Sequence, residues 1–227
     1  MSPPLLGVKG LRKTWAGQPV LDGLELEMET GQHTLICGTS GAGKSTLLGV
    51  LARLVRPDAG ELRLDGADIA GLGAATRYRR ECLGLVFQDP LLINSLNSFQ
   101  NIEMASMQHK VRGPGPAALL GLLGLQSRAT VRAGVLSRGE RQRLALARAF
   151  VGRPRLVLAD EPTASLDPPS RDAVLDQLFA LANAAGATVL LVSHDASVSA
   201  RPELQRRLSL DAGRLHETGT PAASERP

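Results

Sequence analysis

Alternating apolar and polar residues predict one half-exposed strand near the start of the chain. Along residues 20–28, Leu24, Leu26 and Met28 are separated by Glu25 and Glu27. This period of two is typical of an antiparallel strand with one face in solvent. Short apolar runs predict further strands at residues 34–37, 61–64, 83–87, 156–159 and 188–192. The last two runs are rich in leucine or β-branched residues, which is typical of parallel strands covered on both faces.

Helical spacing separates these strands. A glycine-rich turn precedes a helix predicted over residues 45–54, and the turn residues at 56–60 (Arg-Pro-Asp-Ala-Gly) end it. Residues 170–185 predict an amphipathic helix between the last two strands. From about residue 89 to residue 152 the pattern is helical, with loop residues at 113–116. The alternation of strands and helices therefore predicts an α/β sheet that carries a helical insertion.

Composition excludes some classes of protein. Hydrophobic residues make up 43% and charged residues 21% of the 227 residues, so the chain can bury a core and is not disordered as a whole. Aromatic residues are only 3%, which argues against a binder of single-stranded nucleic acid, because such proteins stack bases on aromatic rings. The formal net charge of +4 suits an anionic small molecule, an anionic membrane surface or nucleic acid, without choosing among them.

Cysteine usage and the absence of targeting patterns favour a soluble cytoplasmic protein. Cys37 and Cys82 are far apart and form no C-x-x-C pair, so we expect neither a zinc site nor a disulfide framework. Residues 1–10 lack the pattern of a signal peptide. The longest uncharged stretch, residues 177–193, divides into a helix end and a strand, so we expect no segment that spans a bilayer by itself.

A glycine-rich loop with the spacing G-x-x-x-x-G-K-S follows the strand predicted at 34–37. It comprises Gly38, Thr39, Ser40, Gly41, Ala42, Gly43, Lys44 and Ser45. In a phosphate-binding loop, backbone N–H groups converge on phosphates and the next helix adds the positive end of its dipole. Lys44 would reach the β- and γ-phosphates of a nucleotide, and Ser45 would ligate Mg²⁺. The G-x-S-x-G nucleophile elbow does not fit, because alanine stands at its last glycine.

Two carboxylates, Asp160 and Glu161, follow the apolar strand predicted at 156–159. Catalytic groups of α/β proteins lie at the carboxyl ends of strands. Asp160 would hold Mg²⁺, and Glu161 would polarise the attacking water. By themselves these two residues would also fit a strand followed by an acidic helix cap, but beside a lysine-containing phosphate loop we favour the catalytic interpretation.

A serine-glycine turn opens a helix at residues 136–149. Ser137 fits an N-cap and Glu140 the capping-box position, which locally predicts only a helix start. Together with the preceding motifs, in this order, the run Leu-Ser-Arg-Gly-Glu at 136–140 resembles the L-S-G-G-Q/E signature of nucleotide-binding subunits of ABC transporters. The resemblance covers almost the whole chain.

The resemblance implies a single ABC ATP-binding domain: an α/β P-loop NTPase core with an antiparallel β-subdomain and an inserted helical subdomain. Residues 1–88 and 153–218 would form the nucleotide-binding core with the β-subdomain. Residues 89–152 would form the helical subdomain, and residues 219–227 a mobile tail. ATP and Mg²⁺ are the implied substrate and cofactor, and ATPase activity is the implied reaction.

The resemblance also assigns roles that local patterns leave open. Trp15 would stack on adenine, although a lone tryptophan is more often a partly exposed core residue. Gln88 would sense Mg²⁺ and the attacking water. His194 would contact the γ-phosphate, although a lone histidine at a strand end is usually structural. Thr46 would join the phosphate-binding residues.

Three further residues would act across a dimer. Ser137 and Gly139 match residues that contact the γ-phosphate held by the opposite subunit, and Asp167 lies in a Ser-Leu-Asp run that resembles the D-loop. Arg138 departs from the family pattern, because glycine usually stands there. Its side chain would either add positive charge near that γ-phosphate or face solvent, and we favour the second arrangement, since other family members close their dimers with glycine at this position.

The amino-acid sequences of residues 137–149 and 158–167 are similar to those of the lipoprotein-releasing, macrolide-exporter and cell-division group of this family. This similarity implies a homodimer around two ATP molecules that drives separate transmembrane permease subunits, with the chain held on the cytoplasmic face of the inner membrane through them. Two alternatives stay open: a soluble ABC-type ATPase acting on nucleic acid or the ribosome, and a P-loop kinase or nucleotide-binding regulator.

Overall fold

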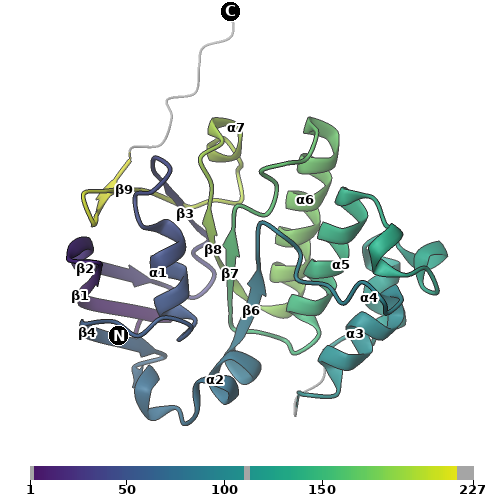
Figure 1. Ribbon diagram of the computed structural model, residues 1–227, viewed down its shortest axis with the longest axis horizontal. Helices are drawn as coiled ribbons and strands as arrows, with labels where there is room; N and C mark the ends of the chain where they lie inside the picture. The colour runs from purple at the N-terminus through teal and green to yellow at the C-terminus, as the bar shows by residue number, and fades with distance from the viewer. Residues whose placement is uncertain (1–2, 110–112, 219–227) are drawn as a thin grey trace, which may run out of the picture. The chain divides into compact units, whose positions relative to one another are not determined.

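The computed structural model describes residues 3–109 and 113–218, which divide into two compact units (Figure 1). Unit 1 comprises the chain up to Ala75 together with the residues from Leu190 onward, and unit 2 spans Thr76–Val189. The tail for which the sequence predicts mobility lies outside the described residues.

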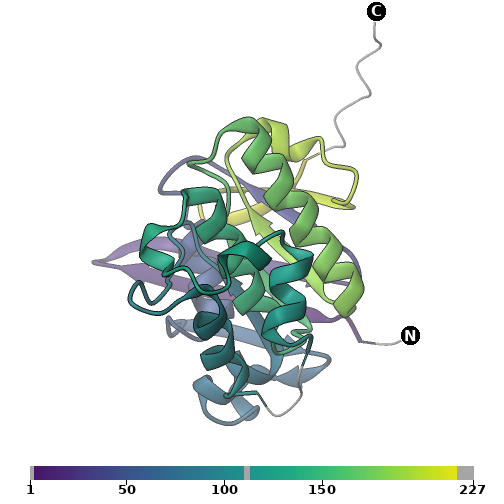
Figure 2. The same cartoon turned by 90° about the vertical axis from the view of Figure 1, so that its right-hand side faces the viewer.

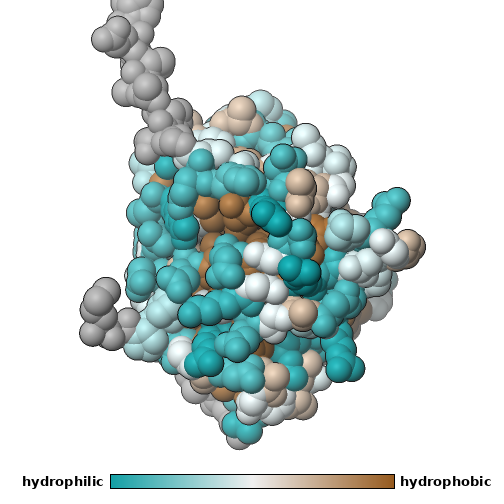
Figure 3. Space-filling model, turned by 90° about the vertical axis from the view of Figure 1, so that its left-hand side faces the viewer, coloured by the Kyte–Doolittle hydropathy of each residue, from teal (hydrophilic) through white to brown (hydrophobic). Residues whose placement is uncertain are grey.

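Unit 1 contains an antiparallel sheet with the strand order β2-β1-β4-β5. Strand β2 (Gln18–Met28) confirms the alternating pattern at 20–28, and its Leu21, Leu24, Leu26 and Met28 side chains are buried. It pairs with β1 (Leu6–Trp15), which the pattern did not predict. Strands β4 (Ala59–Leu64) and β5 (Ala67–Asp68) and the 3₁₀ turn η1 (Ile69–Gly71) complete this part. Figure 3 shows a mainly hydrophilic face with apolar atoms in a hollow.

The remaining strands of unit 1 belong to the same sheet as β3 (Thr34–Cys37), which has the predicted bounds. Strand β8 (Thr188–Val192), which crosses the boundary between the units, also has the predicted bounds, and it pairs with β3 in parallel. Strand β9 (Arg206–Asp211) pairs with the other side of β3 in parallel, and β10 (Arg214–Glu217) pairs with β9 antiparallel. The short helix α7 (Ala196–Ser199) follows β8.

Helix α1 (Lys44–Leu51) is shorter than the helix predicted at 45–54. Its end is set by Arg53, whose φ of 52° is left-handed, and by the N–H groups of Leu54 and Val55, which both donate to the Gly49 carbonyl. The Arg53 guanidinium donates to the carbonyls of Ile69 and Gly73. The helix therefore ends before the proline turn, because the next residues adopt a hydrogen-bonded turn of their own.

Unit 2 combines two parallel strands with helices, and Figure 2 shows these helices in teal to green. The strands are β6 (Leu83–Val86), one residue shorter than predicted, and β7 (Leu156–Asp160). The stretch at 89–152 contains the predicted helices, α3 (Ser98–Ser106), α4 (Pro116–Leu122) and α5 (Arg138–Phe150), and the 3₁₀ turns η2 (Gln126–Arg128) and η3 (Ala133–Val135). Helix α6 (Pro168–Ala185) confirms the helix predicted at 170–185 and packs against α5. Helix α2 (Ala75–Cys82) was not predicted.

Leucine, valine and alanine build the core of each unit, as the low aromatic content requires. Leu35, Ile36, Leu47 and Val50 are fully buried in unit 1, and Leu146, Val157 and Leu178 in unit 2. Among the residues that the structure describes, no helix is both long and apolar enough to cross a membrane.

Candidate nucleotide-binding site

The predicted site residues fall into two groups, one in each unit. Unit 1 holds Trp15, the glycine-rich loop with the start of α1, and His194. Unit 2 holds Gln88, Ser137, Gly139, Asp160, Glu161 and Asp167.

The glycine-rich loop of unit 1 connects β3 to α1, and two of its glycines are required by close packing. A Cβ on Gly38 would lie 2.7 Å from the Leu210 carbonyl oxygen. Gly43, the N-cap residue of α1, has a φ of 101°, and a Cβ there would lie 2.7 Å from Cγ1 of Val20. Neither position leaves room for a side chain. The backbone can therefore turn sharply into the helix, as a phosphate-binding loop requires.

Lys44 begins α1 and is buried, with 6% of its surface exposed. Its Nζ donates to the carbonyl oxygens of Gly38 and Thr39, both at 2.8 Å. An ammonium has three N–H donors and no acceptor, so two of them hold the loop's own backbone. The loop is thus folded around a positive charge at its centre, which is the electrostatic arrangement that attracts phosphate.

The first turn of α1 supplies further donors. Ser45 is exposed and Thr46 is half-buried. The first helical bond runs from Leu47 N–H to the Gly43 carbonyl, so the N–H groups of the three residues between them have no partner within the helix. Such groups at a helix N-terminus bind anions. In the loop, Ala42 N–H donates to the Thr39 carbonyl at 3.2 Å, and Thr39, Ser40 and Gly41 are exposed.

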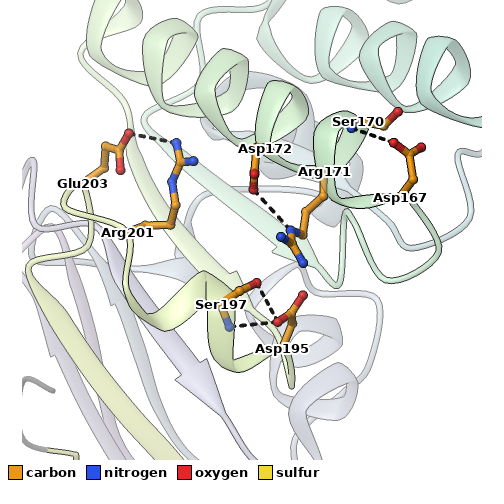
Figure 4. Close-up of polar contacts among 8 residues, drawn as sticks. All are labelled: Asp167, Ser170, Arg171, Asp172, Asp195, Ser197, Arg201 and Glu203. Atoms are coloured by element: carbon orange, nitrogen blue, oxygen red, sulfur yellow. Dashed lines mark hydrogen bonds and ion pairs between the residues drawn. The ribbon is translucent and has the colours of Figure 1, made fainter. Parts of the chain in front are cut away.

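His194 lies at the same edge of the sheet as this loop. It follows β8, whose neighbour β3 leads into the loop, and Ser193 N–H donates to the Ile36 carbonyl at 3.2 Å. The imidazole is exposed. The next residue, Asp195, caps α7 by accepting hydrogen bonds from Ser197 N–H at 2.8 Å and Ser197 Oγ at 2.7 Å (Figure 4). The structure therefore brings His194 and the phosphate loop to one edge of unit 1.

Trp15 ends β1 and is half-exposed, as an aromatic platform requires. Lys13 Nζ lies 4.8 Å from the centre of its ring. The same ammonium is 2.8 Å from Asp58 Oδ1, and hydrogen bonds from Lys13 and then from Thr14 hold the pKa of Asp58 below its ordinary value. Trp15 pairs with Gln18, two residues before the Val20 that packs against Gly43. The hairpin of β1 and β2 therefore carries the Trp15 ring and also packs, through Val20, against the phosphate loop.

Gln88, Asp160 and Glu161 lie together at one edge of unit 2. Strands β6 and β7 are parallel neighbours with Val86 opposite Ala159. Gln88 follows Val86 by two residues, and the two carboxylates directly follow Ala159, so all three emerge at the carboxyl end of the strand pair. Gln88 is exposed, and both carboxylates are half-buried.

Glu161 has an unusual backbone conformation. Its φ is 44°, in the left-handed region that residues other than glycine rarely adopt, and its carbonyl accepts a hydrogen bond from Ala164 N–H. Such conformations cost about 1–3 kcal/mol and cluster at functional sites. The strain at Glu161 turns the chain sharply at the end of β7 and supports a functional role for this carboxylate.

The predicted capping box is present at the start of α5. Ser137 Oγ accepts from Glu140 N–H at 3.3 Å, and Glu140 Oε2 accepts from Ser137 N–H at 2.8 Å. Arg128 Nε lies 2.7 Å from Glu140 Oε1, and this contact, followed by those of Ser137, holds the pKa of Glu140 below its ordinary value. The Arg138 side chain is exposed.

Gly139 and Asp167 lie close together because α5 packs on α6. A Cβ on Gly139 would lie 3.7 Å from Ser170 Oγ. Asp167 is the N-cap of α6 and accepts from Ser170 N–H at 3.1 Å (Figure 4). Hydrogen bonds from Ser170 hold the pKa of Asp167 below its ordinary value. Asp167, for which the sequence predicts a D-loop role, therefore has a local structural function as a helix cap.

Sequence reasoning missed the residues that support the site without belonging to a motif. Val20 packs on Gly43, Lys13 and Asp58 hold the end of β1 beside Trp15, and Arg128 anchors the capping box. Lys13 and Asp58 are 45 residues apart, so no local pattern identifies them as partners.

Comparison with known proteins agrees with these motifs. The family model described as ABC transporter matches residues 21–164. The lipoprotein-releasing system ATP-binding protein LolD of Roseobacter denitrificans is 37% identical over 228 residues, covering 96% of this chain and 100% of that protein. The macrolide export ATP-binding/permease protein MacB 1/2 of Paracoccus denitrificans is 38% identical, covering 99% of this chain and 35% of that protein.

A solved structure extends the match to the fold. The dimeric, post-hydrolysis ATP-binding cassette MJ0796 bound to ADP and Pi superposes with a TM-score of 0.82 at 29% identity, covering 94% of this chain and 99% of that one. The resemblance inferred from the sequence and the predicted fold class are both confirmed. The chain belongs to the ABC transporter family, among its ATP-binding proteins.

Proposed function

We propose that this chain is the ATP-binding and ATP-hydrolysing subunit of a multi-subunit ABC transporter related to the lipoprotein-releasing and macrolide-export systems. The observation that carries the proposal is the phosphate-binding loop folded around Lys44 in a chain of which 96% matches LolD. The names of these relatives indicate different transported substrates, so we propose the class of transporter and no particular substrate.

Each candidate residue receives a role in the proposal. Lys44 and the N–H groups at the start of α1 bind the phosphates and neutralise charge as it develops. Glu161 orients and polarises the attacking water, and His194 contacts the γ-phosphate. Ser137 and Gly139 of one copy contact the nucleotide bound by Lys44 of the other, so the proposed active form is a homodimer. The dimeric state of the related cassette supports this arrangement.

Ser45, Gln88 and Asp160 are the proposed Mg²⁺ ligands. Hydroxyl, amide and carboxylate oxygens are the donors that this hard cation prefers, and Asp160 is the half-buried last residue of β7. When bound, Mg²⁺ neutralises negative charge on the β- and γ-phosphate oxygens. Residues 89–152 are separately proposed to form the helical subdomain.

Membrane association through separate permease subunits, on the cytoplasmic face of the inner membrane, can be tested directly. The tagged chain is expressed in its source cells, and membranes are extracted with detergent. We expect the chain to co-purify with integral membrane proteins in fixed stoichiometry and its ATPase rate to depend on them. Recovery with ribosomes or nucleic acid instead would favour the soluble ABC ATPase.

Trp15 is proposed to stack on adenine, because it is half-exposed on the hairpin that packs on the phosphate loop. Trp15→Ala is expected to weaken ATP binding by about 1 kcal/mol, the scale of an aromatic contact. Trp15→Phe, which keeps a ring, should lose less. Because Trp15 is the chain's single tryptophan, ATP should also change the emission of the wild-type protein. Unchanged emission together with unchanged affinity of Trp15→Ala would contradict the stacking role.

A further inference from the structure

A buried glutamine of α5 holds the peptide group that precedes Gln88. Gln142 is 2% exposed, and its Nε2 donates to the Phe87 carbonyl oxygen at 3.1 Å. The two residues are 55 positions apart, and both belong to unit 2. None of the roles proposed above uses Gln142, although burial of a polar side chain is costly unless its hydrogen bonds are made.

The geometry of this contact bears directly on Gln88. The Phe87 carbonyl belongs to the same planar peptide unit as the N–H and Cα of Gln88. Strand β6 ends at Val86, so the strand pairing with β7 no longer constrains this peptide. A hydrogen bond that fixes the carbonyl oxygen therefore fixes the orientation of the peptide plane, and with it the direction in which Gln88 leaves the strand.

The same helix holds the segment that follows Gln88. Arg148 Nη1 donates to the Leu91 carbonyl, and Arg141 Nη1 donates to Asn94 Oδ1 at 3.0 Å and to the Ala133 carbonyl at 3.1 Å. Side chains from α5 thus contact the segment 87–94 at its beginning, middle and end. Rigid-body displacement of α5 would carry this segment with it.

Helix α5 begins directly after Ser137, which is five residues before Gln142 and about 7–8 Å away along the helix axis. We infer that Gln142 is a positioning residue for Gln88. This inference rests on the proposed function, in which Gln88 serves the nucleotide site of its own copy.

Gln142→Met tests the inference, because methionine has a similar length and helix propensity but no donor. We expect kcat to fall about tenfold, the effect of losing one well-placed interaction in the transition state, with ATP affinity changed less than about twofold. The Mg²⁺ concentration for half-maximal rate should rise, as it should in Gln88→Ala. Gln177→Met is the matched control, since it removes a half-buried glutamine of α6 in the same unit, and its kinetics should remain wild-type.

A double-mutant cycle separates positioning from a general loss of packing. If Gln142 acts through Gln88, adding Gln142→Met to Gln88→Ala should change kcat less than about twofold. Gln142→Asn, which keeps the amide but is too short to reach the same carbonyl, should reproduce the loss and replaces Gln142→Met if that variant does not fold.

Two results would overturn the inference: equal loss of kcat in the wild-type and Gln88→Ala backgrounds, or Gln142 variants as active as Gln177→Met. In either case Gln142 would contribute to the packing of α5 and would not position Gln88. A wild-type chain without ATPase activity would instead contradict the proposed function, so the two failures are distinguishable.

Discussion

Replacing Glu161 by glutamine is expected to abolish measurable ATP turnover while ATP binding persists. Glutamine keeps the shape of the side chain but removes the carboxylate that polarises water, and a positioned proton acceptor contributes about 10²- to 10⁴-fold to rate. Because the bound ATP is no longer consumed, the closed dimer should accumulate. Phosphate release measures turnover, and sedimentation with and without ATP measures dimerisation.

Asp172→Asn is the matched control for Glu161→Gln. Asp172 is an exposed carboxylate of α6 in the same unit, paired with Arg171 at 3.2 Å, and its neutralisation should leave turnover unchanged. Equal ATPase rates for wild type and Glu161→Gln would rule out the proposed role. The left-handed backbone at Glu161 would then need another explanation.

Lys44→Ala is expected to lose ATP binding itself, which separates it from Glu161→Gln. The substitution removes the ammonium that is proposed to reach the phosphates and also the two hydrogen bonds to the carbonyls of Gly38 and Thr39. Hydrogen bonds to charged groups contribute about 1.5–3 kcal/mol each, so we expect ATP affinity to fall by about 100-fold or more. Titration calorimetry with a non-hydrolysable ATP analogue measures this loss.

Two further variants make the result on Lys44 specific. Lys9→Ala removes an exposed lysine of β1 in the same unit and should bind ATP as the wild type does. Lys44→Met keeps most of the buried stem, so it should stay folded in thermal unfolding while losing affinity as Lys44→Ala does. Wild-type affinity in a folded Lys44→Met protein would refute the role of the ammonium.

Motifs that are contiguous in sequence could be predicted because their geometry is local. The loop from Gly38 to Ser45, the capping box of Ser137 and Glu140, and the carboxylates at the end of β7 depend on neighbouring residues, and the structure contains each of these local features. The alternation at 20–28 and the apolar runs at 34–37 and 188–192 identified strands for the same reason. Strands β1, β9 and β10 were missed because pairing, more than their own periodicity, defines them: β9 pairs with the distant β3, and β1 and β10 pair with the strands next to them in the chain.

The sequence by itself determined the family, the order of the motifs and the chemical type of each candidate group, because these depend on residue identity and short spacing. Only the tertiary structure decided which groups become neighbours. Parallel pairing of β6 with β7 places Gln88 and Glu161 at the same end of the strand pair, packing of Val20 leaves no room for a side chain at Gly43, and α5 places Gln142 within hydrogen-bond distance of the Phe87 carbonyl. These contacts join residues far apart in the chain, and such contacts follow from how strands and helices pack.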